Sequence, residues 1–244
     1  MLSEHEIERY ARHLILPEIG GAGQQALKKA RILVIGAGGL GCPNLTYLAA
    51  AGIGHIGIID HDIVSLSNLQ RQTLYSISDI GKKKAECAKE NLLALNPENH
   101  IESYCEKLTI ENAAIIIAQY DIICDGSDNF ETRYLVAQTA QSLEKPLVTA
   151  AVNRFDGYIT LLKPFETDAK GQPFARFEDI FPQGDQDMAL PTCAEVGVLG
   201  IVTGLLGTLQ ALEVIREITK FGDSLLGFLL LIDLMTLRFE KIKV

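Results

Sequence analysis

A glycine-rich stretch near the start of the chain, ILVIGAGGLG at 32–41, has the spacing of a nucleotide-binding loop. The apolar residues 32–35 predict a buried strand, and Gly36, Gly38 and Gly41 then fit the pattern G-x-G-x-x-G leading into a helix. The first glycine permits a tight turn, the second lets the backbone approach a phosphate, and the third lets the helix pack closely on the strand. Because free N–H groups at a helix start attract anions, we expect this loop, Gly39 included, to bind a nucleotide.

The glycine loop by itself does not distinguish NAD from ATP. Asp60 lies 24 positions after Gly36, at the end of the apolar segment HIGIID, where an acid commonly hydrogen-bonds a ribose hydroxyl of either nucleotide. None of the seven tyrosines has a lysine four residues later, as a short-chain dehydrogenase needs. The sequence also lacks the pattern G-x-x-x-x-G-K-S/T of P-loop nucleotidases. The hydride-transfer hypothesis is therefore weakened, and a P-loop enzyme has no support.

Further polar residues follow the predicted strands and supply groups that a polyphosphate and a metal ion require. Arg71 and Lys84 are cations that would screen phosphate oxygens, and Asn68 precedes them in the same segment. Asp128 and Asn129 follow the apolar segment DIICD, and a carboxylate such as Asp128 is a hard oxygen ligand suited to Mg²⁺. Loops after different parallel strands converge on one crevice, so we expect these side chains to surround a single ligand.

The elements that position these residues alternate between strand and helix. The strands predicted from apolar runs cover 32–35, 55–60, 101–104, 121–125 and 146–152. The helices predicted between them cover about 39–51, 82–95, 110–119 and 130–143. This series of βαβ units predicts a Rossmann-like α/β fold, with a mostly parallel sheet and helices on both faces.

Both ends of the chain depart from this alternation. Ser3 and Glu6 form a plausible capping box for a helix through about Leu14, and a second helix near 24–30 would complete an N-terminal helical extension over 1–30. The segment 157–163 follows the previous strand after a short turn, so the two must be antiparallel, and 225–233 with 237–244 suggests a closing hairpin. We therefore expect C-terminal antiparallel strands in one domain over 1–244, with a mobile crossover loop at about 164–191.

Composition and charge exclude some classes of protein. The 244 residues carry a net charge of −9, which argues against a nonspecific nucleic-acid binder because such proteins normally present a basic surface. The five cysteines are odd in number and form no C-x-x-C pair, so neither a disulfide framework nor a zinc knuckle is expected. The segment MLSEHEIERY lacks the basic and apolar regions of a secretory signal. Together these features favour the reducing cytoplasm.

One uncharged segment is almost long enough to be a transmembrane helix. Residues 196–212 are 17 residues without a charge, at the short limit for a transmembrane helix. Four glycines, two threonines and one glutamine interrupt its hydropathy, and no second such stretch exists. We therefore expect no membrane association, and we predict that this segment is buried within the protein, against a second subunit.

Six ordered motifs together resemble a known family. They are RYARHLILPEIGGAGQQAL, GAGGLGCPNLTYLAAAGIGHIGIIDHD, VSLSNLQRQTLY, GKKKAE, GSDNFETRY and PTCAEVGVLG. From Arg9 to about Glu240 the chain is similar to the bacterial relatives of the ubiquitin-activating enzyme, the ThiF, MoeB and HesA group. These are adenylyltransferases of molybdopterin and thiamin biosynthesis. A glycine loop alone is weak evidence, whereas six motifs in order at matching spacing are specific.

The resemblance implies a reaction and a role for each residue of the crevice. The enzymes of this family use Mg·ATP to adenylylate the C-terminal Gly-Gly carboxylate of a ubiquitin-like sulfur-carrier protein, releasing pyrophosphate. Asp60 would hold the ribose, and Asp128 would hold Mg²⁺. Asn68, Arg71 and Lys84 would contact the phosphates.

Two further residues take a role only from the resemblance. Arg12, in the RYARH motif, would reach ATP from the partner subunit, so that a homodimer is needed for activity. Cys193 aligns with a cysteine that in some members forms a disulfide-linked intermediate with the carrier.

The chain departs from the family in two ways. Many relatives hold a structural zinc with two C-x-x-C pairs, but Phe174 and Phe177 take the place of the first pair, and the second is absent from LRFEKIKV. We predict no structural zinc. The chain also has no rhodanese-like extension, so sulfur would come from another protein in trans.

Each assignment has a structural alternative. Arg71 and Lys84 are ordinary surface cations in that reading, as Lys82 and Lys83 are expected to be. Asp128 with Asn129 would cap the following helix, a role compatible with ligand binding. Arg12 would pair with Glu8 one helical turn away, and Cys193 would be a structural thiol.

Three other functions remain open at the level of the whole chain. One is a catalytically idle homologue that only binds a ubiquitin-like partner, and another is an NAD-dependent oxidoreductase. The third keeps the adenylylation chemistry but takes another acceptor, on modified tRNA or on a small peptide.

Overall fold

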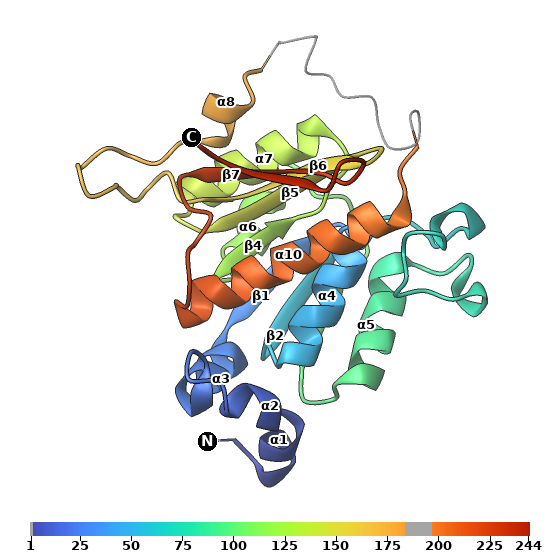
Figure 1. Cartoon of the computed structure of the whole chain (residues 1–244). Helices are drawn as coiled ribbons and strands as arrows, with labels where there is room; N and C mark the ends of the chain where they lie inside the picture. Colours follow the sequence, from blue (N-terminus) through green and yellow to red (C-terminus); the bar gives the residue numbers. More distant parts are fainter. Residues whose placement is uncertain (1, 184–196) are drawn as a thin grey trace.

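The computed structural model describes residues 2–183 and 197–244, and these form an eight-stranded sheet in the order β3-β2-β1-β4-β5-β6-β7-β8 (Figure 1). The strands are β1 (Arg31–Ile35), β2 (His55–Ile59), β3 (His100–Tyr104), β4 (Ile122–Asp125), β5 (Leu147–Asn153), β6 (Asp156–Leu162), β7 (Phe228–Asp233) and β8 (Arg238–Lys243). The five strands from β3 to β5 are parallel to one another, and the pairs β5–β6, β6–β7 and β7–β8 are antiparallel. The predicted mixed sheet is confirmed.

Helices cover both faces of this sheet, as predicted. The helices are α1 (Glu4–Arg9), α2 (Ala11–Leu14), α3 (Gly20–Lys29), α4 (Gly41–Ala51), α5 (Lys84–Leu95), α6 (Ala113–Ile117), α7 (Phe130–Ser142), α8 (Phe177–Ile180) and α10 (Gly200–Thr219). Residues of α3, α4, α5 and α10 share one hydrophobic core with the sheet. Residues of α6, α7 and α8 share a second core on the opposite face. The alternating apolar side chains of the central strands therefore pack into two separate layers.

The N-terminal extension differs from the prediction of one helix through Leu14. Ser3 and Glu6 form the expected capping box of α1, but the helix ends at Arg9 and α2 begins after Tyr10. Tyr10 is buried, and its hydroxyl accepts a hydrogen bond from Asn96 Nδ2 at 2.9 Å. The second helix, α3, starts earlier than predicted and ends at Lys29. The contact of Tyr10 with Asn96, 86 residues away in sequence, accompanies the break between α1 and α2.

The long helix α10 accounts for the uncharged segment. Its buried face, which includes Val202, Leu206, Ala211 and Val214, joins the core shared with α4 and the sheet. Among the described helices, none combines the length and hydropathy needed to cross a bilayer. One face of this segment is therefore buried within the protein, as predicted, whereas Leu199 and Ile201 are exposed. Its packing against a second subunit stays a prediction.

Two connecting segments contain more structure than predicted, and one helix is shorter. The segment between β2 and α5 includes the 3₁₀ turns η1 (Leu66–Asn68) and η2 (Ile77–Asp79). The described part of the crossover segment contains α8, whose Phe177 is buried in the second core. Helix α6 covers only Ala113–Ile117 of the predicted 110–119.

Candidate active site

A cleft of about 420 Å³ opens where the parallel strands end, a volume typical of small-molecule sites. Residues from the ends of β1 and β2 and from the loop after β4 line it. The predicted site residues that line it are Gly36, Gly38, Gly39, Asp60, Asn68, Arg71, Lys84, Asp128 and Asn129. The structure therefore brings together groups that lie up to 93 positions apart in sequence, from Gly36 to Asn129.

The glycine loop has the geometry that its spacing predicts. Gly36 has φ +86°, a left-handed conformation that favours glycine, and its N–H donates to the carbonyl of Ile59 at 2.9 Å. Gly41 does not line the cleft, but a Cβ there would collide with the carbonyl oxygen of Gly36. Gly41 therefore allows α4 to start directly against the loop, and its role is in packing.

Asp60 links the glycine loop to the end of β2. Its Oδ2 accepts a hydrogen bond from the N–H of Ala37 at 2.8 Å, and its Oδ1 accepts one from the N–H of Asp62 at 2.8 Å. The residue is 9% exposed and lines the cleft. Each carboxylate oxygen has a second lone pair, so the structural bonds leave capacity for a ribose hydroxyl.

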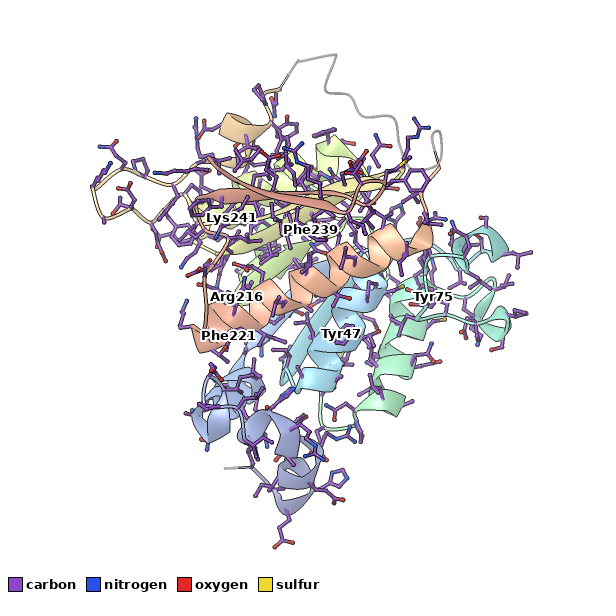
Figure 2. The ribbon with its side chains drawn as sticks, viewed as in Figure 1. Tyr47, Tyr75, Arg216, Phe221, Phe239 and Lys241 are labelled. Carbon is purple, nitrogen blue, oxygen red and sulfur yellow. The ribbon has the colours of Figure 1, made fainter. Side chains whose placement is uncertain are left out.

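A buried tyrosine fastens the segment between β2 and α5 to the same loop, and Figure 2 shows Tyr75 beside α5. The Tyr75 hydroxyl donates to the carbonyl of Ala37 at 2.7 Å and lies 3.3 Å from the carbonyl of Lys84. Burial raises the pKa of Tyr75, so the hydroxyl remains a donor at neutral pH. Tyr75 thus holds the segment that carries Arg71 against the glycine loop.

Arg71 and Asn68 are positioned by short-range contacts within that segment. Arg71 Nη1 donates to the carbonyl of Ser67 at 3.1 Å, and Asn68 Oδ1 accepts from the N–H of Ser65 at 3.3 Å. Both side chains are partly exposed and line the cleft. Neither contact neutralises the guanidinium of Arg71, which remains available to an anionic ligand.

Lys84 is not an ordinary surface cation. It is the first residue of α5 and only 5% exposed, and its Nζ lies 2.8 Å from Asp62 Oδ2. Burial raises the pKa of Asp62, but the hydrogen bond from Lys84 lowers it and the net shift is downward. Asp62 also lines the cleft and was missed in the sequence analysis, although it lies two positions after Asp60.

Asp128 and Asn129, in the loop after β4, make different contacts. Asn129 is the N-cap of α7, and its Oδ1 accepts a hydrogen bond from the N–H of Thr132 at 2.9 Å. Asp128 does not cap the helix, and within the described residues its Oδ1 accepts only a 3.3 Å hydrogen bond from Asn129 Nδ2. Asp128 is exposed and lines the cleft, so its carboxylate is free to bind a cation there.

A second missed residue, Arg133, supports this loop from α7. Although its exposed fraction is 7%, its Nη2 donates to the carbonyl of Ser127 at 2.8 Å and its Nη1 to the hydroxyl of Tyr158 at 3.2 Å. Burial raises the pKa of Tyr158 to about 12. Arg133 lies within the motif GSDNFETRY, but the motif does not indicate its burial, because that depends on the contacts with Ser127 and Tyr158 that folding brings about.

The comparisons with known proteins place this site in a family. The family model described as ThiF family matches residues 10–244. The chain belongs to the ThiF family. It is 43% identical over 242 residues to the sulfur carrier protein adenylyltransferase of Thermus thermophilus, covering 99% of this chain and 89% of that protein.

Other relatives extend the ThiF-family assignment. The chain is 43% identical over 243 residues to the probable adenylyltransferase/sulfurtransferase MoeZ of Mycobacterium tuberculosis. This match covers 100% of this chain but only 61% of the length of MoeZ. The crystal structure of E. coli MccB with ATP superposes with a TM-score of 0.80 at 25% identity, covering 100% of this chain and 73% of that one. The crystal structure of PaaA has a TM-score of 0.82 at 22% identity, over 100% and 75% of the two chains, and supports the fold.

Two predicted residues of the ThiF-family chain lie apart from the cleft or outside the described residues. Arg12 is an exposed residue of α2, does not line the cleft of its own chain, and makes no ion pair with Glu8 within the described part of the chain. Cys193 lies outside the described residues, so its role stays a prediction.

The residues that line the cleft fit a nucleoside triphosphate with a metal ion. Two of its buried polar atoms, Gln72 Oε1 and Ser127 Oγ, have no hydrogen-bond partner among the described residues. Buried polar groups are normally paired, so these atoms indicate a polar ligand. Gln72 is only 3% exposed and was not predicted as a site residue. Its place directly after Arg71 in the motif VSLSNLQRQTLY could have indicated it.

Proposed function

We propose that this protein uses ATP to adenylylate the C-terminal Gly-Gly carboxylate of a ubiquitin-like sulfur-carrier protein. A carboxylate oxygen of the carrier attacks the α-phosphorus, the bond from that phosphorus to the bridging oxygen breaks, and pyrophosphate leaves. The product is an acyl adenylate, in which the carboxyl carbon is activated toward a sulfur nucleophile. The single observation that carries the proposal is the convergence of Arg71, Lys84 and Asp128 on the cleft behind the glycine loop.

Charge placement is the main contribution that these residues make. The attack brings an anion toward a polyanion, so fixed positive groups lower its barrier more than a strong base does. Lys84 is held by Asp62 at 2.8 Å, and Arg71 is held by its own turn, so both cations are positioned before substrate binds. Asn68 would hydrogen-bond the phosphates beside them, and Asp60 would orient the ribose.

Asp128 is the residue proposed to hold Mg²⁺. Its carboxylate lines the cleft and is not consumed by the helix cap, which Asn129 provides. When bound, Mg²⁺ would offset phosphate charge and polarise the phosphoryl oxygens. The cleft glycines Gly38 and Gly39 leave the backbone accessible to the phosphates.

The names of the relatives support the acceptor class. The Thermus relative is named a sulfur carrier protein adenylyltransferase, and a relative from Porphyra purpurea is named a probable molybdopterin-synthase adenylyltransferase. These names favour a sulfur carrier of molybdopterin biosynthesis, and the thiamin carrier is the second substrate to test.

We also propose that the active unit is a homodimer, with Arg12 of each subunit reaching the ATP of the other. Support comes from the exposed side of α10, where Leu199 and Ile201 are 52% and 67% exposed. Together with Phe155, Met235 and Leu237 they line an apolar groove of about 690 Å³. A second copy covering this groove would bury apolar area that a monomer leaves in water.

The four described cysteines are free thiols, which is consistent with the proposed cytoplasmic location.

The test is formation of the adenylylated carrier. The protein is incubated with Mg·ATP and each candidate carrier, and mass spectrometry measures the AMP adduct at the terminal glycine. We expect an adduct with one carrier, and we expect Arg71→Ala and Asp128→Ala to lose it while remaining folded, because both are cleft residues that are not buried. Lys82→Ala is the matched control, since Lys82 is paired with Asp79 outside the cleft.

Three outcomes would contradict the proposal. If Arg71→Ala and Asp128→Ala form the adduct at the rate of Lys82→Ala, the cleft is not the reacting site. If NADH raises the melting temperature and Mg·ATP does not, the cleft binds a dinucleotide and the oxidoreductase hypothesis gains support. A homologue that only binds the carrier would show complex formation without any adduct.

A further inference from the structure

A second cluster of ligating side chains lies at the other end of β2 and β3. It contains His55 and His100, the first residues of these strands, together with Glu102. His55 and Asp60 are five residues apart along an extended strand, so the cluster is about 16 Å from the nucleotide cleft. None of the three residues lines that cleft. The cluster therefore needs an explanation separate from the proposed reaction.

The three side chains converge on one point. Glu102 Oε1 lies 3.5 Å from His55 Nε2 and 3.4 Å from His100 Nε2. One ligand atom from each residue falls within 4.8 Å of the others. Zinc bonds to histidine nitrogen at about 2.0–2.1 Å, and a tetrahedral site then places its ligand atoms about 3.3 Å apart. The separations of 3.5 Å and 3.4 Å match that spacing closely.

Two tyrosines orient the carboxylate of Glu102. Glu102 Oε2 accepts hydrogen bonds from Tyr104 Oη at 2.8 Å and from Tyr120 Oη at 3.1 Å. Because both phenols bind Oε2, the other oxygen is turned toward the histidine pair. Such outer hydrogen bonds are what fixes the ligand carboxylates of protein metal sites.

One group opposes a metal ion here. Arg31 Nη2 lies 3.3 Å from His55 Nε2, and Arg31 Nη1 lies 3.1 Å from His55 Nδ1. The guanidinium is tethered through its Nε to the carbonyl of Gln119 at 2.6 Å. A bound cation must displace the Nη2 contact and tolerate the adjacent charge, which limits the affinity.

We propose that His55, His100 and Glu102 form a binding site for a divalent transition metal ion of the zinc class, with water as the fourth ligand. Two imidazoles and one carboxylate form a donor set that zinc uses in proteins. This site differs from the zinc sites that C-x-x-C pairs form, because its ligands are two histidines and a glutamate. The proposal does not depend on the proposed adenylylation. The ion would join the starts of two neighbouring strands and stabilise that edge of the sheet.

The test is titration of the whole, untagged, metal-free protein with Zn²⁺ by calorimetry, in the presence of excess Mg²⁺. We expect one zinc per chain with a micromolar dissociation constant. His100→Ala and Glu102→Gln should each weaken binding at least tenfold, and circular dichroism should show that both variants are folded, since His100 is exposed. His5→Ala is the matched control, because His5 faces a single glutamate, Glu98, at 3.6 Å and should leave binding unchanged.

Two further variants separate this site from other histidines. The cleft holds a second grouping, Asp60, His61 and Asp62, so loss of binding in His61→Ala with full binding in His100→Ala would overturn the proposal. Arg31→Gln removes the competing cation and should tighten zinc binding severalfold. Unchanged or weaker binding in Arg31→Gln, or no zinc binding by the unaltered protein, would also overturn it.

Discussion

At the scale of single residues, Asp62 holds the buried cation Lys84 at the cleft, where the proposed reaction places a phosphate. Lys84 is almost fully buried, whereas the side chain of Asp62 is 54% exposed. Water therefore stabilises the anion of the pair more than the cation, and the lysine depends on its partner. An incoming phosphate offers the same lysine a second anion without requiring it to move away from α5.

We expect Lys84→Met to remain folded. Its adenylylation rate should be lower by about 10²-fold or more, because removal of one preorganised charged or hydrogen-bonding group has such an effect in other active sites. Methionine fills a similar volume, and Asp62 is exposed enough to be solvated alone. Single-turnover adduct formation measures the rate. Lys82→Met, at an exposed position outside the cleft, should retain it. A full rate in Lys84→Met would remove this residue from the mechanism.

Glu102 predicts a pH dependence of stability. Its pKa is about 2 in the folded chain, below the ordinary value of 4.5, so its contribution is present above about pH 4.5 and is lost as the pH falls toward 2. We expect the urea midpoint of the unaltered protein to fall more between about pH 5 and about pH 3 than that of Glu102→Gln. Parallel pH profiles of the two proteins would contradict this assignment.

The sequence predicted cleft residues where a local pattern marks them. The glycine spacing and the acids after strand ends are such patterns, and Asp60 and Asp128 were found in this way. Arg133 and Asp62 were missed because their roles depend on a partner brought close by folding. His55 and His100 lie 45 positions apart and meet only because β2 pairs with β3 in register.

At the scale of elements, the start of α4 depends on close contact with the loop that precedes it. A Cβ at Gly41 would collide with the carbonyl of Gly36, so we expect Gly41→Ala to destabilise the protein by about 1–3 kcal/mol through overpacking. Displacement of the loop should also weaken ATP binding. Thermal denaturation and nucleotide titration measure the two effects.

The matched control for Gly41 is Gly21 in α3, where an added Cβ meets nothing within 4 Å. Gly21→Ala should be neutral or stabilising by up to about 1 kcal/mol, because alanine is the better helix former. Equal stability of Gly41→Ala and Gly21→Ala would show that the loop accommodates the extra carbon.

The type of most elements followed from periodicity, but some boundaries did not. The break at Tyr10 accompanies a contact with Asn96, and α8 carries Phe177 into the second core. Such contacts between distant segments leave no signal in a local window of sequence. The end of α7 was predictable because the apolar run of β5 follows it closely. The antiparallel pairing of β6 was predictable because only a short turn separates it from β5.

At the scale of the whole molecule, the N-terminal helices lie at the end of the sheet remote from the segment that carries Arg71, as Figure 1 shows. Arg12 is on these helices and does not line the cleft of its own chain. A catalytic role for Arg12 therefore requires a second subunit.

Mixing two inactive variants tests this arrangement. Arg12→Ala and Asp128→Ala are each expected to be inactive, whereas their mixed dimers contain one intact site. Random reassociation of equal amounts should therefore restore about a quarter of the unaltered activity. Light scattering checks that the mixture is dimeric, and a mixture as inactive as its components would argue against a shared site.

The division of labour after β4, in which Asn129 caps α7 and Asp128 is left to the cleft, has a consequence for separating stability from chemistry. Aspartate and asparagine cap helices almost equally well, so exchanging the two neighbours preserves composition, isoelectric point and cap alike. The swapped chain would differ from its parent only in where one negative charge sits. It should melt at the parental temperature yet need far more magnesium to turn over, a dissociation that no single alanine substitution there offers.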